Sequence, residues 1–112
     1  MIIEVYVCGY LNGNSGIPAF GEIPEQAPER FFVVDKLGSG EEDLIGSAMI
    51  AVQSYAPSKL EAAVLNEQVK ELMKHIVEKS EISSCKLNSD YDYTDTKSKR
   101  YRYQAVFDIV HF

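Results

Sequence analysis

An amphipathic helix between strand-like segments is the feature that most constrains this chain. Pro57 ends the preceding segment, and Ser58 with Glu61 forms an S-x-x-E capping box, which satisfies free amides at a helix start. Apolar residues then recur at three- and four-residue steps on one face: Leu65, Val69, Leu72, Met73 and Ile76. The pattern predicts a long helix over about 58–79 that must bury this face against another layer.

The segments on either side of this helix have the composition of β-strands. RFFVVDKL (30–37) and GSAMIAVQSYA (46–56) precede it, and residues 82–93 and 100–112 follow it. A brief strand is also expected at 17–22. The short connection between the first two long segments predicts that they pair antiparallel. GSGEED, residues 38–43, is expected to be a glycine-opened acidic loop between them.

Residues 1–14 fit two structures. Ile2, Ile3 and Val5 favour a strand, whereas the spacing of the apolar residues also makes a helical stripe; we prefer a short helix. The whole chain has 112 residues, enough for one domain with a modest core. We therefore expect a single α+β domain over 1–112, with a mixed, mainly antiparallel sheet of about four to five strands.

Charge and cysteine content narrow the function classes. The net charge of −6 disfavours nucleic-acid binding, which depends on neutralising phosphates. Cys8 and Cys85 share no CxxC or Cys/His spacing, so we expect free thiols in a reducing compartment. The N-terminal apolar run is too short and interrupted for a signal peptide or a membrane span, so we expect a protein that is not exported and has no membrane partner.

Three groups of residues are candidate sites of chemistry. DYDYTD (90–95) departs from a calcium loop, because Asp95 occupies the position that requires glycine. Glu71, His75 and Glu78 share a helix face and could touch one metal, although a solvated polar face is the better interpretation. Cys8 and Cys85 have no neighbouring sequence that suggests nucleophilic catalysis, and His111, which alternates with Phe107 and Ile109, is expected to be structural. We expect no catalytic, metal or cofactor site.

Charge placement is the remaining signal. Between Glu22 and Asp43 there are seven acids and two bases, and between Lys97 and Arg102 there are four bases and no acid. Opposite charges on one small domain suit a head-to-tail interface that closes into a ring. Ordinary solvated turns remain an alternative. The candidate interface residues are Glu41, Glu42, Asp43, Lys97, Lys99, Arg100 and Arg102.

The order of three segments resembles the tail-terminator (tail-completion, head–tail joining) proteins of long-tailed bacteriophages and prophages. These segments are IPAFGEIPEQAPERFFVVDKLGSG, SAMIAVQSYAPSKLEAAVLNEQVKELM and SDYDYTDTKSKRYRYQAVFDIVHF. The resemblance covers nearly the whole chain, is weakest over 1–14, and includes no catalytic signature. It implies a sheet covered on one face by the long helix and a short N-terminal helix.

The resemblance also implies a function without bond-making. Such proteins form a ring, commonly of six subunits, that caps the tail tube, ends its polymerisation and joins the tail to the head. The implied partners are further copies of the chain, the tail tube protein and the head connector or head-completion protein, in the virion tail and earlier in the host cytoplasm. A head-completion or tail-assembly accessory protein is the alternative, followed by a small ligand-binding or enzymatic α+β domain.

Within this interpretation we expect arginines of the terminal strand to contact acids of a neighbouring copy. Tyr101, Tyr103, Ala105, Phe107 and Ile109 should point to one face of that strand. Arg100 and Arg102 should point to the other face and pair with the Glu41–Asp43 segment of the next subunit, because a guanidinium binds carboxylate bidentately.

Overall fold

The computed structural model describes residues 1–112 and shows an α+β domain with a five-stranded sheet. The sheet contains β1 (Ala19–Phe20), β2 (Phe31–Glu42), β3 (Ile45–Ala56), β4 (Ile82–Asp92) and β5 (Tyr101–His111). Its spatial order is β1-β2-β3-β5-β4, so the last strand of the chain lies between β3 and β4. β1 is parallel to β2, and every other neighbouring pair is antiparallel. The predicted fold class is confirmed.

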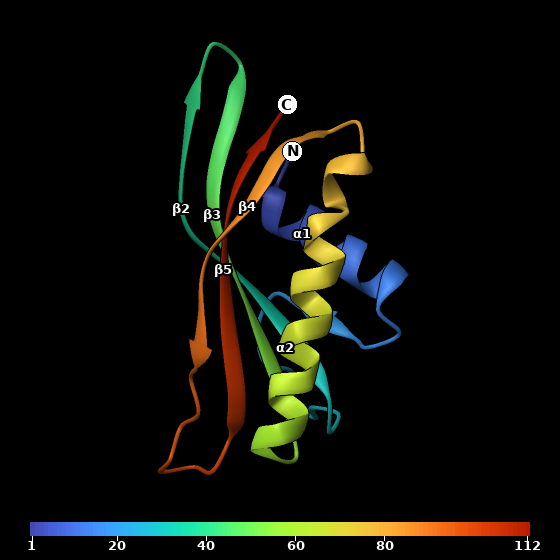
Figure 1. Ribbon diagram of the computed structural model, residues 1–112, viewed down its shortest axis with the longest axis vertical. Coiled ribbons are helices and arrows are strands. Elements are labelled where there is room, and N and C mark those ends of the chain that lie inside the picture. The colour runs from blue at the N-terminus through green and yellow to red at the C-terminus, as the bar shows by residue number, and fades with distance from the viewer.

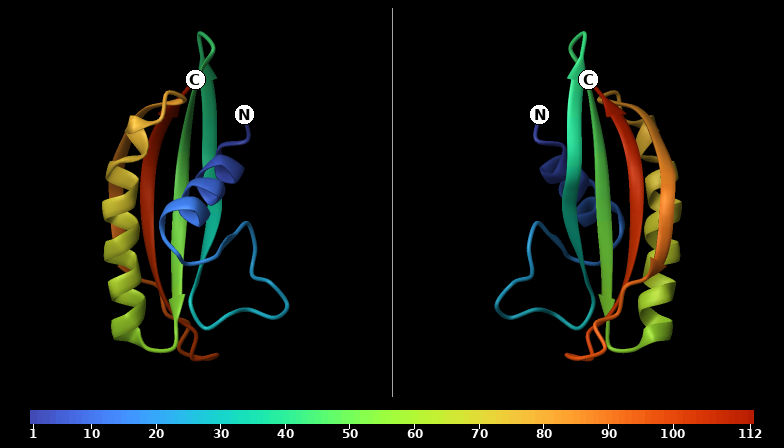
Figure 2. Two further views of the ribbon diagram at one scale, coloured as in Figure 1. Left: turned by 90° about the vertical axis from the view of Figure 1, so that its right-hand side faces the viewer. Right: turned by 90° about the vertical axis from the view of Figure 1, so that its left-hand side faces the viewer.

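Both helices cover the same face of this sheet (Figure 1). They are α1 (Ile3–Asn14) and α2 (Lys59–Lys74). A short 3₁₀ helix, Ile76–Glu78, follows α2, so the α-helix ends earlier than predicted and its last turn tightens. Nineteen buried residues form the core between the helices and the sheet. The opposite face of the sheet has no helix over it (Figure 2, right).

The start of α2 follows from its capping residues. The Ser58 hydroxyl accepts a hydrogen bond from the Glu61 amide, as the capping box predicts. The Glu61 carboxylate accepts from the same hydroxyl and forms an ion pair with Arg30, which precedes β2. The predicted apolar face is confirmed, with Leu65, Val69, Met73 and Ile76 buried and Leu72 half-buried.

The first fourteen residues form the helix that we preferred over a strand. Ile3, Val7 and Leu11 recur every four residues and are buried against the sheet. The Asn12 side chain then donates to the Ala19 carbonyl and accepts from the Ala19 amide, which holds β1 beside the helix. The Tyr10 hydroxyl donates to the Leu72 carbonyl at 2.6 Å and so links α1 to α2.

The glycine-opened loop predicted at 38–43 is wrong. β2 continues through this segment to Glu42, and only Asp43 and Leu44 form the turn to β3. Gly38 borders a β-bulge at Leu37, and Gly40 pairs in regular register with Ser47, so neither glycine reverses the chain. Pairing with β3 supplies the hydrogen bonds of this exposed segment, so tertiary pairing outweighs the local preference of glycine for loops.

Candidate functional site

The predicted interface residues lie at opposite ends of an elongated molecule. The principal dimensions are 44 × 25 × 25 Å, and the strands run along the long axis (Figure 1). The β2–β3 turn forms one end, and the β4–β5 connection, residues 93–100, lies at the other. The structure therefore separates the acidic group from the basic group within one chain and does not bring them together.

The acidic end consists of exposed side chains without ion pairs inside the chain. Glu41, Glu42 and Asp43 are all exposed, and none of them forms an intrachain salt bridge. The next residue, Leu44, is 86% exposed and is apolar. The end of the hairpin thus presents three carboxylates beside two aliphatic side chains, of which Leu44 is far more exposed than Ile45.

The turn at this end has an unusual backbone. Asp43 and Leu44 have φ angles of 51° and 68°, as a two-residue hairpin turn with two left-handed residues requires. Glycine or asparagine suits such positions, whereas leucine costs about 1–2 kcal/mol there. A leucine at this position is therefore both strained and almost fully exposed, which neither turn formation nor core packing explains.

The basic end is organised by Asp95. Its carboxylate accepts hydrogen bonds from the Ser98 hydroxyl and the Lys97 amide, and the Ser98 contact is the main cause that lowers the pKa of Asp95. Backbone hydrogen bonds between Asp95 and Arg100 close the loop. The side chains of Lys97, Lys99 and Arg100 are exposed and form no ion pair within the chain.

Arg102, the fourth predicted interface cation, is largely engaged within its own subunit. Its Nε donates to the Tyr93 carbonyl at 2.7 Å, and its Nη1 donates to the Tyr55 hydroxyl at 2.9 Å. Its guanidinium also lies over the rings of both tyrosines. The other amino group, Nη2, forms no hydrogen bond in the chain. Pairing of Arg102 with a neighbouring subunit stays a prediction.

These contacts belong to an aromatic row on the uncovered face of the sheet. The Phe31 and Tyr55 rings stack with their centres 4.5 Å apart, and Phe20 meets Phe31 edge-on. Arg102 continues the row from Tyr55 to Tyr93, the residue that follows β4. The stacked rings bury one another, so Phe31 and Tyr55 are each only 4% exposed although no helix covers them. Sequence reasoning missed this row, because cross-strand neighbours depend on strand order.

A hollow of about 220 Å³ opens at the basic end. Its walls come from the 27–29 segment, the start of β2, the end of β3 and the 99–101 segment. Its lining combines apolar side chains with the cations Lys99 and Arg100. Glu29 is the acid in this lining, and its carboxylate lies 3.5 Å from the Arg30 guanidinium, so its charge already has a partner.

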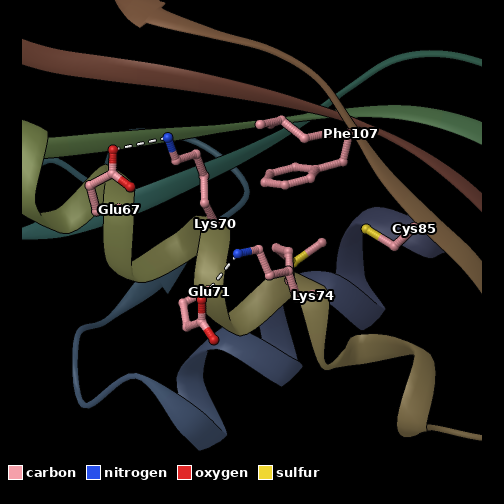
Figure 3. A pocket seen from close by; sticks show the side chains of 8 residues that line it. Glu67, Lys70, Glu71, Lys74, Cys85 and Phe107 are labelled. Carbon is pink, nitrogen blue, oxygen red and sulfur yellow. Dashed lines mark hydrogen bonds and ion pairs between the residues drawn. The ribbon is translucent and has the colours of Figure 1, made fainter.

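A second hollow, of about 250 Å³, lies between α2 and the strands β4 and β5 (Figure 3). Its charged side chains pair with one another along the helix, with Lys70 2.9 Å from Glu67 and Lys74 3.3 Å from Glu71. Cys85 lies at the far wall, where burial raises its pKa to about 11. At neutral pH this thiol is therefore protonated and a poor nucleophile.

The remaining candidates for chemistry are dispersed. His75 lies between Glu78 at 3.2 Å and Glu71 at 3.5 Å, and these carboxylates, Glu78 above all, raise its pKa. No three His, Cys, Asp or Glu side chains are placed to hold a metal ion. Cys8 and Cys85 are both free thiols, and no helix is long and apolar enough to cross a membrane.

Neither a search of protein-family models nor a search of curated proteins finds a match to this sequence.

Proposed function

We propose that the chain is a structural tail protein of a long-tailed bacteriophage or prophage, and that copies of it form a ring that caps the tail tube. The single observation that carries this proposal is the placement of unpaired acids and unpaired bases at opposite ends of one 44 Å domain. A surface that is complementary to a different surface of the same molecule builds rings or filaments, because each copy offers one end to the next. The sequence resemblance selects the ring.

In this proposal the ring acts by shape and charge. It ends polymerisation of the tail tube protein by occupying the last layer of the tube, and its other side meets the head connector or head-completion protein. The ring is expected to contain six subunits. The proposal implies that the protein acts in the virion tail, and in the host cytoplasm during assembly.

Electron microscopy of particles assembled without this protein tests the proposal. We expect tubes of uncontrolled length that carry no heads, with defined length restored when the protein is supplied in trans. Tails of normal length that fail to join heads would instead assign it to head completion. Normal, infectious particles would refute a role in the virion altogether.

A further inference from the structure

We propose that Leu44, at the acidic turn, inserts into the hollow at the basic end of a second copy of this chain. This inference rests on the proposed ring and specifies the contact that would build it. The apolar side chain would lie against Pro28 and Pro57, while Glu41 and Glu42 beside it face Lys99 and Arg100 of the other copy.

The two surfaces match in size and polarity. The hollow has about 220 Å³, and a cavity of about 150 Å³ already holds a benzene molecule, so one leucine side chain fits. Its apolar lining includes Phe31 and Tyr55, which are held in place by their stacking. A rigid wall lowers the entropy lost when a partner binds. Leu44, in turn, is the most exposed of the large apolar side chains in the chain.

The charges match as well. The acids beside Leu44 and the cations at the hollow have no ion-pair partner inside the chain, and Glu29 in the lining is paired with Arg30. Opposite potentials at the two surfaces favour this orientation of two copies over end-to-end contact of like charges. Because the surfaces differ, each copy can both insert a leucine and receive one.

Two variants separate the two sides of the contact. Leu44→Gly removes the inserted side chain and, because glycine accepts the left-handed backbone, leaves the thermal midpoint of the dilute protein unchanged or higher. Lys99→Glu with Arg100→Glu reverses the charge at the hollow. Each variant alone is expected to weaken self-association, measured by sedimentation equilibrium, by about tenfold or more.

The decisive measurement mixes the two variants. One retains an intact hollow and the other an intact turn, so an equimolar mixture should form a one-to-one dimer that grows no further. Lys79→Glu with Lys86→Glu is the matched control, because it changes the net charge equally at exposed sites outside the hollow. This control should assemble like the unmodified chain.

Three results would overturn the contact: no self-association of the unmodified chain up to about 1 mM, full association of Leu44→Gly, or no dimer in the mixture. Overlong tubes in the absence of the protein, together with any of these results, would leave the proposed function standing and show that another surface joins the subunits. The opposite combination is a dimer in the mixture of variants and normal tails when particles assemble without the protein. It would support the contact and refute the proposed function.

Discussion

The guanidinium carbon of Arg102 lies 4.5 Å from the centre of the Tyr93 ring. The same group donates hydrogen bonds to the Tyr93 carbonyl and the Tyr55 hydroxyl, so at the basic end β5 is tied to β3 and to the residue that follows β4. A side chain that the sequence marks as a surface cation therefore organises the uncovered face of the sheet. This planar group serves at once as a donor and as a stacking surface.

Replacing this arginine tests its structural role. Arg102→Lys keeps the charge but loses the two directed hydrogen bonds and the planar stacking, so we expect the free energy of unfolding to fall by about 1–2 kcal/mol. Urea unfolding monitored by tyrosine fluorescence measures this change. Arg100→Lys is the control, because the Arg100 side chain is exposed, and its effect should stay within about 0.5 kcal/mol. Equal effects of the two variants would contradict the role of Arg102.

Two adjacent residues of α2 test which face of the helix packs against the sheet. Met73 is fully buried in the core, whereas its neighbour Leu72 is half-buried at the margin. Met73→Ala should lower the free energy of unfolding by about 2–5 kcal/mol, because it leaves a cavity. Leu72→Ala should cost clearly less, since solvent can fill part of the space. Chemical denaturation compares them, and a larger effect at Leu72 would mean that α2 is rotated from the position described.

Truncation at Ser54, unlike truncation at the buried Met73, is not expected to destabilise the protein. Its side chain is fully buried in β3, and its hydroxyl has no hydrogen-bond partner. Removal of an unsatisfied polar group relieves the cost of its desolvation. Ser54→Ala should therefore leave the thermal midpoint unchanged or raise it by a few degrees, as differential scanning calorimetry would show. A clear loss of stability would reveal a hydrogen bond at this hydroxyl that the structure lacks.

Asp92 links the end of β4 to the start of α2 and gives a pH dependence. Hydrogen bonds from Thr94, aided by Lys59 at 3.0 Å, lower the pKa of Asp92 from 3.8 to about 2. The folded state therefore gains stability from this carboxylate above pH 3.8 and loses it as the pH falls towards 2.

Thermal unfolding as a function of pH measures this contribution. Asp92→Asn should unfold at a lower temperature than the unmodified protein at neutral pH, and the difference should shrink as the pH falls through this window. Glu25→Gln, which removes an exposed carboxylate without a hydrogen bond in the chain, is the control. A constant difference at every pH would show that ionisation of Asp92 contributes nothing.

Local signals predicted the helices and long strands well. The Ser58–Glu61 cap and the spacing of apolar residues locate α2, and alternation locates the inward face of β5, because these patterns concern neighbours along the chain. The strand order and the pairing of Tyr55 with Arg102 depend on which strands meet, which no local pattern specifies. The sequence predicts a loop in place of the acidic hairpin because the turn residues, Asp43 and Leu44, lack the glycine that such turns favour.

The sequence likewise predicts some features of the candidate site and not others. Of the predicted interface residues, all but Arg102 are exposed, because runs of like charge remain in solvent, whereas Arg102 is half-buried. Charge placement could not show that the acidic and basic groups lie at opposite ends, nor that Arg102 is engaged by aromatic rings. The hollow at the basic end was also beyond reach, since its walls come from four separate segments of the chain.

β2 and β3 pair, with one bulge, from the stacked rings at one extremity to the strained turn at the other. Each additional residue in a strand lengthens it by about 3.4 Å. The separation between the two extremities is thus fixed by how many residue pairs this ladder contains, and insertion of one pair would alter the repeat distance of any assembly joined through them. The circumference of the proposed ring would then depend on the length of the β2–β3 hairpin.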